Sequence, residues 1–183
     1  MVLRFLVLGL LSVQPMTGYD LKRAFDHSVR HFWAADRSQL YRTLAALVAA
    51  GHADVEVVAQ ESYPDRKVHH ITPAGRVALR DWLASPLEVE DQRDPFLGRV
   101  FFGDALDDDA LADLFAARRR QAEAMLEALT AEDARVTAEL AAQAAGAPAD
   151  RGLALRLATL RSGLAHARTE LAWLDETARE VLP

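Results

Sequence analysis

Residues 36–51 read DRSQLYRTLAALVAAG, a stretch that contains the start, the buried stripe and the end of one helix. Asp36 is a favoured N-cap residue, and Gln39 follows it at the spacing of a capping box. A glycine, Gly51, stands where helices usually end. The apolar residues that recur at helical spacing are Leu40, Leu44, Leu47 and Val48. The stretch therefore predicts an amphipathic helix over residues 36–50.

The face opposite that stripe is polar at its N-terminal end and small at its C-terminal end. Ser38, Gln39 and Arg42 fall in the first two turns, from which a recognition helix contacts DNA bases. The alanines at positions 45, 46 and 49 would let the helix backbone approach a groove wall. An ordinary amphipathic surface helix has the same pattern, so the helix alone leaves both interpretations open.

A β-hairpin is predicted directly after this helix. Residues 52–58 read HADVEVV, and the apolar positions 53, 55 and 57 alternate with acidic ones at the period of a half-buried strand. Turn-forming residues follow, and then residues 66–72 read RKVHHIT, a second short strand. Pro73 suits the first position of another helix with a threonine cap before it. Helix, hairpin and helix in this order predict a winged helix, with the recognition helix at 36–50 and the wing at 52–71.

Several segments resemble the PadR family of bacterial transcriptional regulators. They are QLYRTLAAL at 39–47, RKVHHITPAGRVAL at 66–79, and MTGYDL at 16–21, which follows LLS and Pro15. The resemblance extends over the whole chain, and the C-terminal half is similar to the helical dimerisation region of the longer, virulence-activator-like members. His69 departs from the family pattern, in which a tyrosine is expected at this position.

The resemblance implies a dimeric regulator that binds double-stranded DNA at an inverted-repeat operator, as a repressor that a small-molecule effector releases. Bases are expected to be read by Ser38, Gln39 and Arg42. Phosphates are expected to be held by Tyr41 and by two cations where the hairpin leaves its tip. The full set predicted to contact DNA is Arg37, Ser38, Gln39, Tyr41, Arg42, Arg66, Lys67 and His69.

The distribution of charge supports a DNA-binding N-terminal half. The chain has 183 residues and a formal net charge of −6. Residues 1–85 contain 10 Lys and Arg against 8 Asp and Glu, a balance of +2, whereas residues 86–183 contain 11 against 19, a balance of −8. A weakly basic domain needs focused contacts with phosphates, and two copies of it would strengthen binding.

The remaining composition favours a cytoplasmic protein with no membrane partner. There is no cysteine, so disulfide and thiol chemistry are excluded. The apolar stretch 1–12 carries one arginine, lacks an Ala-x-Ala cleavage site and is too short to cross a bilayer. It is interpreted as a buried first helix.

The predicted fold is mainly α, with a winged helix-turn-helix domain at 1–85 and an α-helical, coiled-coil-like dimerisation domain at 86–183. In the first helix the expected buried residues are Leu3, Leu6, Val7, Leu10 and Leu11. Thr17 is expected to cap a second helix that contains Leu21 and Phe25. In the helix at 73–84 the residues expected to face inward are Val77, Leu79, Trp82 and Leu83.

A short apolar helix is predicted at 95–103, after an acidic linker. Its large apolar residues Phe96, Leu97, Val100, Phe101 and Phe102 are expected to be covered, at the junction of the two halves. Trp33, Trp82, Phe96 and Phe101 are the candidate lining of a pocket for a small aromatic effector. Simple core packing explains these four aromatic residues equally well.

Two long helices are predicted over the rest of the chain, one from about residue 108 to residue 143 and, after a hairpin loop at 145–150, one that contains the stretch 153–181. The first has a seam of Leu111, Phe115, Ala122, Met125, Leu129 and Val136, interrupted at Arg118 and Glu132. The arginine run 118–120 is interpreted as an ion-paired helix face rather than a nucleic-acid patch.

The heptad of the last helix is unbroken from residue 153 to residue 181. The residues predicted to form a dimer interface are Leu153, Leu157, Leu160, Leu164, Leu171 and Leu174. The alternative is that this seam packs only against the preceding helix of its own chain.

No enzymatic signature accompanies these features. The sequence has no Gly-x-Gly-x-x-Gly motif, no phosphate-binding loop and no Gly-x-Ser-x-Gly motif. His27 and His31 have a spacing that can bind a metal, but no further ligand completes the set. We therefore expect no enzyme, no metal and no cofactor. A winged helix used only for protein contacts remains the alternative function, and a MarR-like regulator is disfavoured by the heptad after a complete winged helix.

Overall fold

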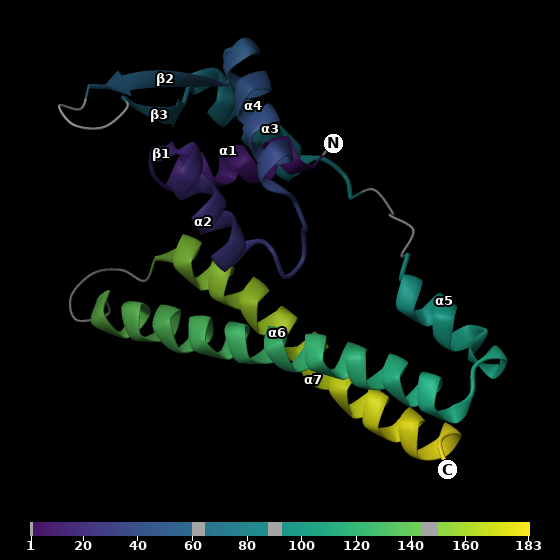
Figure 1. The fold of residues 1–183 in the computed structure, drawn as a ribbon. Helices are drawn as coiled ribbons and strands as arrows, with labels where there is room; N and C mark the ends of the chain where they lie inside the picture. The colour runs from purple at the N-terminus through teal and green to yellow at the C-terminus, as the bar shows by residue number, and fades with distance from the viewer. Residues whose placement is uncertain (1, 60–64, 88–92, 144–149) are drawn as a thin grey trace. The chain divides into compact units, whose positions relative to one another are not determined.

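A computed structural model describes residues 2–59, 65–87, 93–143 and 150–183, which divide into two compact units, Met1–Glu88 and Val89–Pro183. The N-terminal unit contains α1 (Leu3–Val13), β1 (Met16–Thr17), α2 (Gly18–Ser28), α3 (Arg37–Ala49), β2 (Ala53–Val58), β3 (Arg66–Ile71) and α4 (Pro73–Ala84) (Figure 1). The C-terminal unit contains α5 (Pro95–Phe101), the 3-10 helix η1 (Gly103–Ala105), α6 (Asp108–Gln143) and α7 (Arg151–Val181). This architecture confirms the mainly helical fold with a winged helix followed by a helical region.

The ends of α3 are fixed by the interactions that the sequence predicted. The Gln39 amide N–H donates to Asp36 Oδ1 at 2.7 Å, and the Asp36 N–H donates to Gln39 Oε1 at 2.9 Å, which completes the capping box. Gly51 ends the helix with φ of 70°, a conformation that favours glycine. Leu40, Leu44 and Leu47 are buried, so the predicted stripe of α3 is confirmed.

The wing is part of a three-stranded antiparallel sheet of order β1-β3-β2. The sequence predicted only the hairpin β2–β3, because a two-residue strand is too short to show an alternating pattern. β1 pairs Met16 with His69 and Thr17 with Val68 in the middle of β3. This third strand joins the wing to the start of α2.

The prediction of a half-buried β2 is wrong beyond its first residue. Ala53 is buried, but Val55 and Val57 are 36% and 58% exposed. The hairpin extends beyond the helices of its unit, so only its base reaches the core (Figure 1).

Thr72 follows β3 and connects the base of the hairpin to α3 and α4. The Gly75 N–H donates to Thr72 Oγ1 at 3.1 Å, so Thr72 caps α4 as predicted. The same hydroxyl donates to the Gly51 carbonyl at 2.7 Å. A Cβ on Gly75 would lie 2.1 Å from the His52 carbonyl oxygen, so only glycine allows this close approach. The wing is thereby positioned relative to α3.

The core of the N-terminal unit differs in detail from the predicted one. Phe5 and Leu8 are buried although the expected face of α1 left them out, because the other elements of the unit cover α1 over more than one face. Trp82 stacks on Phe5 with ring centroids 4.9 Å apart. Val77 and Leu83 were expected to face inward but are 46% and 67% exposed, since α4 presents a narrower stripe to the core.

The C-terminal unit is built on a hairpin of α6 and α7, which lie side by side (Figure 1). Leu153, Leu157, Leu160 and Leu164 of α7 pack against Leu129 and Val136 of α6. Leu126 faces this cluster where the sequence suggested Met125, which is 37% exposed. No helix within the described ranges is long and apolar enough to cross a membrane.

Within the single chain, this packing occupies the α7 seam that was expected to face a second copy. The residues concerned are Leu153, Leu157, Leu160, Leu164, Leu171 and Leu174. All but Leu171 are buried within the single chain, and Leu171 is half-buried. A helix of the same chain fills the seam without the entropy cost of association.

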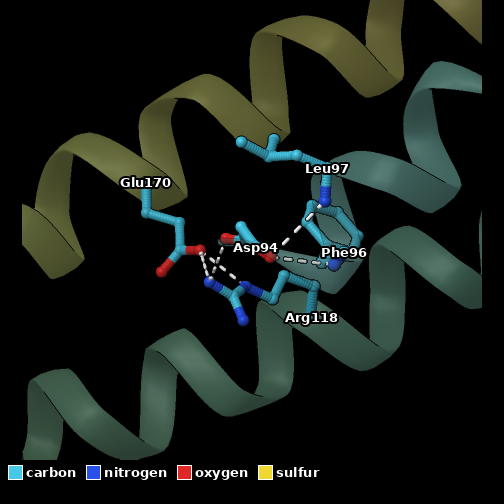
Figure 2. A network of polar contacts seen from close by, with 5 residues as sticks. All are labelled: Asp94, Phe96, Leu97, Arg118 and Glu170. Carbon is cyan, nitrogen blue, oxygen red and sulfur yellow. Dashed lines mark hydrogen bonds and ion pairs between the residues drawn. The ribbon is translucent and has the colours of Figure 1, made fainter. Parts of the chain in front are cut away.

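A polar network fixes α5 to the hairpin (Figure 2). Asp94 caps α5 by accepting from the Phe96 N–H at 2.8 Å. Arg118 interrupts the α6 seam because its guanidinium pairs with Glu170 at 2.5 Å and with Asp94 at 3.5 Å. The guanidinium carbon also lies 5.3 Å from the Phe96 ring centroid. The ion-paired interpretation of the arginine run is confirmed for Arg118, although its side chain is only 29% exposed.

The apolar residues of this segment are only partly covered. Phe96 is buried and makes edge-on contacts with Phe115 and Trp173. Phe101 and Phe102 are 80% and 69% exposed. The prediction that all five large residues are covered is therefore wrong for the chain alone, because the short α5 turns only one face towards α6 and α7.

Replacing Arg118 tests how much the network stabilises the C-terminal unit. Arg118→Met leaves the carboxylates of Asp94 and Glu170 half-buried without a counter-charge, and should lower the free energy of unfolding by about 2–3 kcal/mol. Arg135→Met on the same helix is the matched control, since Arg135 is 62% exposed and should contribute only about 0.5 kcal/mol. Urea unfolding followed by circular dichroism measures both, and equal losses would contradict this role of Arg118.

Candidate nucleic-acid interface

The first two turns of α3 present the predicted polar side chains to solvent. Arg37, Ser38, Gln39 and Arg42 are exposed. The Gln39 carbonyl oxygen is engaged in the capping box, so the side-chain NH2 group is what Gln39 can offer a base. In the following turns of α3 the outer face carries the alanines at 45, 46 and 49, all of which are exposed. A helix with this outer surface can enter the major groove of DNA without a bulky side chain in the way.

Tyr41 is held at one flank of α3 by the start of α2. A Cβ on Gly18 would lie 2.7 Å from the Tyr41 ring, so the absence of a side chain at Gly18 makes room for this ring. The Arg37 guanidinium carbon lies 5.4 Å from the centroid of the same ring. Tyr41 remains 40% exposed, so part of its side chain faces solvent beside the outer surface of α3.

A groove of about 920 Å³ lies between the start of α2, α3 and the wing, and we call it the wing-side groove. The predicted residues that line it are Tyr41, Arg66, Lys67 and His69. Tyr19 and Asp20 of the MTGYDL segment also line this groove, although they are not among the residues predicted to contact DNA, and Tyr19 is 62% exposed.

The two wing cations are not equivalent. Arg66 pairs with Asp20 at 3.6 Å, which offsets part of its charge. Lys67 is exposed and has no ion pair among the residues that the structure describes. Lys67 is therefore the better placed of the two for a phosphate.

Arg42 lies on the other side of α3 from this groove. It lines a hollow of about 400 Å³ between the start of α1 and α3, which we call the α1-side hollow, together with Arg4, Thr43 and His52. The structure thus divides the predicted DNA contacts between the two flanks of one helix. Arg4 was missed because an arginine in an apolar first helix shows no pattern that relates it to residue 42.

His69 is surrounded by other groups at the base of the wing. Burial lowers the pKa of its imidazole below 6.5, the neighbouring His70 and Lys67 act in the same direction, and an interaction with the backbone of Met16 opposes part of this. Its Nδ1 is buried and has no hydrogen-bond partner within the described part of the chain. His69 is therefore neutral near pH 7 and brings no positive charge to a phosphate.

The four residues considered for an effector pocket are divided between the two units. Trp33 and Trp82 pack against the core of the N-terminal unit. Phe96 is buried in the C-terminal unit, where Phe101 makes an edge-on contact with Phe102. Core packing accounts for three of them within their own units, and Phe101 is the exposed exception.

Comparisons with known proteins agree with this geometry. The model of the transcriptional regulator PadR-like family matches residues 7–81, and that of the virulence activator alpha C-terminal region matches residues 92–181. The probable transcriptional regulator Rv1176c of Mycobacterium tuberculosis is 31% identical over an alignment of 193 positions, gaps included, which spans 97% of this chain and 96% of that protein. The negative transcriptional regulator PadR of Bacillus subtilis is 29% identical over 126 residues, covering 68% of this chain and 69% of that one.

Solved structures share the whole fold. The PadR-like transcriptional regulator BC1756 from Bacillus cereus matches with a TM-score of 0.80 at 26% identity, over 98% of this chain and 95% of that one. The Bacillus subtilis PadR in complex with operator DNA matches with a TM-score of 0.77 at 24% identity, over 98% and 99% of the two chains. The winged helix and the long helical hairpin therefore occur together in related regulators.

The lowered pKa of His69 predicts a pH-dependent stability. Between the lowered pKa and 6.5 the unfolded chain binds more protons at this residue than the folded chain does, so stability must fall as the pH drops below 6.5. His69→Tyr removes this titration and should flatten the curve between about pH 7 and pH 5. Thermal unfolding of both proteins across this range measures it, and parallel curves would show that His69 does not contribute.

Proposed function

Since the chain belongs to the PadR-like family of transcriptional regulators, we propose that it is a cytoplasmic, dimeric repressor that binds an inverted-repeat operator. Each copy would place α3 in the major groove and its wing on the adjacent backbone. The observation that carries this proposal is the unobstructed polar and small surface of α3, with the wing residues Arg66 and Lys67 beside it. Regulators of this family are not enzymes, in agreement with the prediction from the sequence.

The base-reading residues lie along one line of α3. Ser38 and Arg42 are four residues apart on the exposed face, and the alanines at 45 and 49 continue the same line. A guanidinium at position 42 can bind a guanine edge with two hydrogen bonds, which discriminates against other bases by roughly 1–3 kcal/mol. Gln39 lies beside this line, and its side-chain NH2 group is available to a base because its side-chain oxygen is used in the capping box.

The backbone contacts would come from the wing-side groove. Lys67 is the principal candidate, because Arg66 is partly neutralised by Asp20. Tyr41 can add a neutral hydrogen bond to a phosphate, and Arg37 next to its ring can add a charge. His69, which is neutral, would support the wing rather than bind a phosphate.

The second copy of the chain would bind at the exposed apolar surface of α5 and η1. This surface is formed by Leu97, Phe101, Phe102 and Leu106, which are 47%, 80%, 69% and 44% exposed. Large exposed apolar groups of this kind usually mark an interaction site. A second copy is the partner that an inverted repeat requires, and α6 already covers Leu153, Leu157, Leu160 and Leu164 of α7.

A small aromatic effector is part of the same proposal. Bacillus subtilis PadR has been solved in complex with p-coumaric acid, which makes this compound a suitable probe. An effector that releases the repressor must bind the free form of the protein more tightly than the DNA-bound form. If p-coumaric acid and related phenolic acids leave the operator affinity unchanged, the proposal of a small aromatic effector is wrong.

Substitutions at Arg42 and Lys67 separate base reading from backbone binding. Arg42→Ala should weaken operator binding about tenfold or more while changing random-duplex binding much less. Lys67→Ala should weaken both equally and lower the salt slope by about one unit per half-site. Binding isotherms at several salt concentrations, on the operator found by footprinting upstream of the gene, measure both.

Two outcomes of that experiment would change the proposal. If Arg42→Ala lowers both affinities by the same factor, Arg42 binds a phosphate, and reading falls to Ser38 and Gln39. If the unmodified protein shows no salt-dependent binding to any duplex, the proposed function is wrong, and a winged helix used for protein contacts takes its place.

The dimer surface is tested by introducing charge into it. Phe101→Glu combined with Phe102→Glu should raise the dimer dissociation constant on the order of 100-fold, because two carboxylates would be desolvated in an apolar contact. Leu155→Glu is the matched control, since Leu155 is 57% exposed on α7 and should tolerate the charge. Analytical ultracentrifugation measures the dimer dissociation constant of both variants. If the double phenylalanine variant stays dimeric while Leu155→Glu is monomeric, the interface lies on α7 instead.

A further inference from the structure

The α1-side hollow differs in charge from the wing-side groove on the opposite flank of α3. The wing-side groove is lined by Arg66 and Lys67 but also by Asp20 and Asp65, so its two positive and two negative charges cancel. The α1-side hollow is lined by Arg4 and Arg42 with no acidic residue, which gives two uncompensated positive charges. An anion would therefore be attracted more strongly to the flank of α3 that faces away from the wing.

Arg4 is exposed and available for such an anion. Within the described residues it has no ion pair, and its guanidinium carbon lies 4.4 Å from the ring centroid of Phe5. That ring is itself stacked on the half-buried Trp82, so the guanidinium rests on a ring that the core holds in place. The flexible part of Arg4 is thereby partly ordered before any ligand arrives.

The position of Arg4 near the N-terminus of α1 also favours a negatively charged partner. Arg4 lies in the first turn of α1, where the helix dipole is positive and disfavours a cation. This turn contains no acidic residue, and no described side chain caps it. A phosphate oxygen at this place would satisfy both the guanidinium and the positive end of the helix.

Resting on the proposed function, we propose that the α1-side hollow is a second DNA-backbone site, in which Arg4 binds a phosphate on the side of the major groove opposite the wing. The recognition helix would then be held from both flanks, by Lys67 in the wing-side groove and by Arg4 across from it. Arg42, between the helix surface and this hollow, stays available for a base edge. Arg4 is thus a positioning residue that fixes how α3 sits in the groove.

The experiment measures the salt dependence of duplex binding for three variants of the full chain. Arg4→Ala should weaken binding to operator and to random duplex by the same factor and lower the salt slope by about one unit per half-site. Arg4→Lys keeps the charge and should keep the slope. Arg80→Ala is the matched control, because Arg80 is an exposed arginine of α4 that lines neither cavity, and it should leave the slope unchanged.

Each other outcome overturns the proposal in a recognisable way. If Arg4→Ala has the same salt slope as the unmodified protein, and that protein binds duplex in a salt-dependent manner, Arg4 is not a second backbone site. The proposed function is then unaffected. Equal slope changes in Arg4→Ala and Arg80→Ala would show a general charge effect instead of a site. Absence of salt-dependent binding by the unmodified protein would overturn the proposed function and this site together. Thermal unfolding of all variants, with unchanged midpoints expected, shows that a lost slope is not a lost fold.

Discussion

The leucines beneath α3 set the orientation of the surface that would meet DNA. Leu40, Leu44 and Leu47 are 0–2% exposed, and each contributes about 1.5–3 kcal/mol by leaving water. Rotating α3 would expose them, so the helix has one stable orientation about its axis. In that orientation Ser38 and Arg42 face solvent. The capping box at Asp36 and the turn at Gly51 fix the two ends, and the helix cannot shift along its axis either.

The wing takes its position from the same constraint. Thr72 bonds to the carbonyl that follows α3 and caps α4, while β1 pairs with the middle of β3 and leads into α2. The hairpin is thus held by α3 and α4 at its base and by β1 at the middle of β3, although its outer part is largely exposed. This arrangement explains how a wing with exposed valines can hold Lys67 at a defined distance from the recognition helix.

Charge placement reconciles an acidic chain with a nucleic-acid partner. The whole chain carries a formal charge of −6, but four basic residues line the cavities on the two flanks of α3, and two of them, Arg4 and Arg42, have no acidic residue beside them in the same cavity. Binding through a few focused cations depends steeply on salt, whereas the acidic C-terminal unit limits attraction to DNA elsewhere on the molecule. Within that unit Arg118 is committed to Glu170 and Asp94, so its charge serves the fold.

The sequence by itself determined the elements whose signals are local. Asp36, Gln39 and Gly51 define α3, while Thr17 caps α2 and Thr72 caps α4. The helical pattern indicated the extent of the long helices. These signals are readable because caps and periodicity act between residues a few positions apart. Tertiary structure decided what each buried face packs against. The heptad of α7 shows that one face is buried, but the same leucines fit a second copy or α6 equally well, and only packing selected α6. Tertiary structure also added β1, placed Arg4 beside Arg42 and left Phe101 uncovered, since these outcomes depend on contacts between distant residues that no local pattern contains.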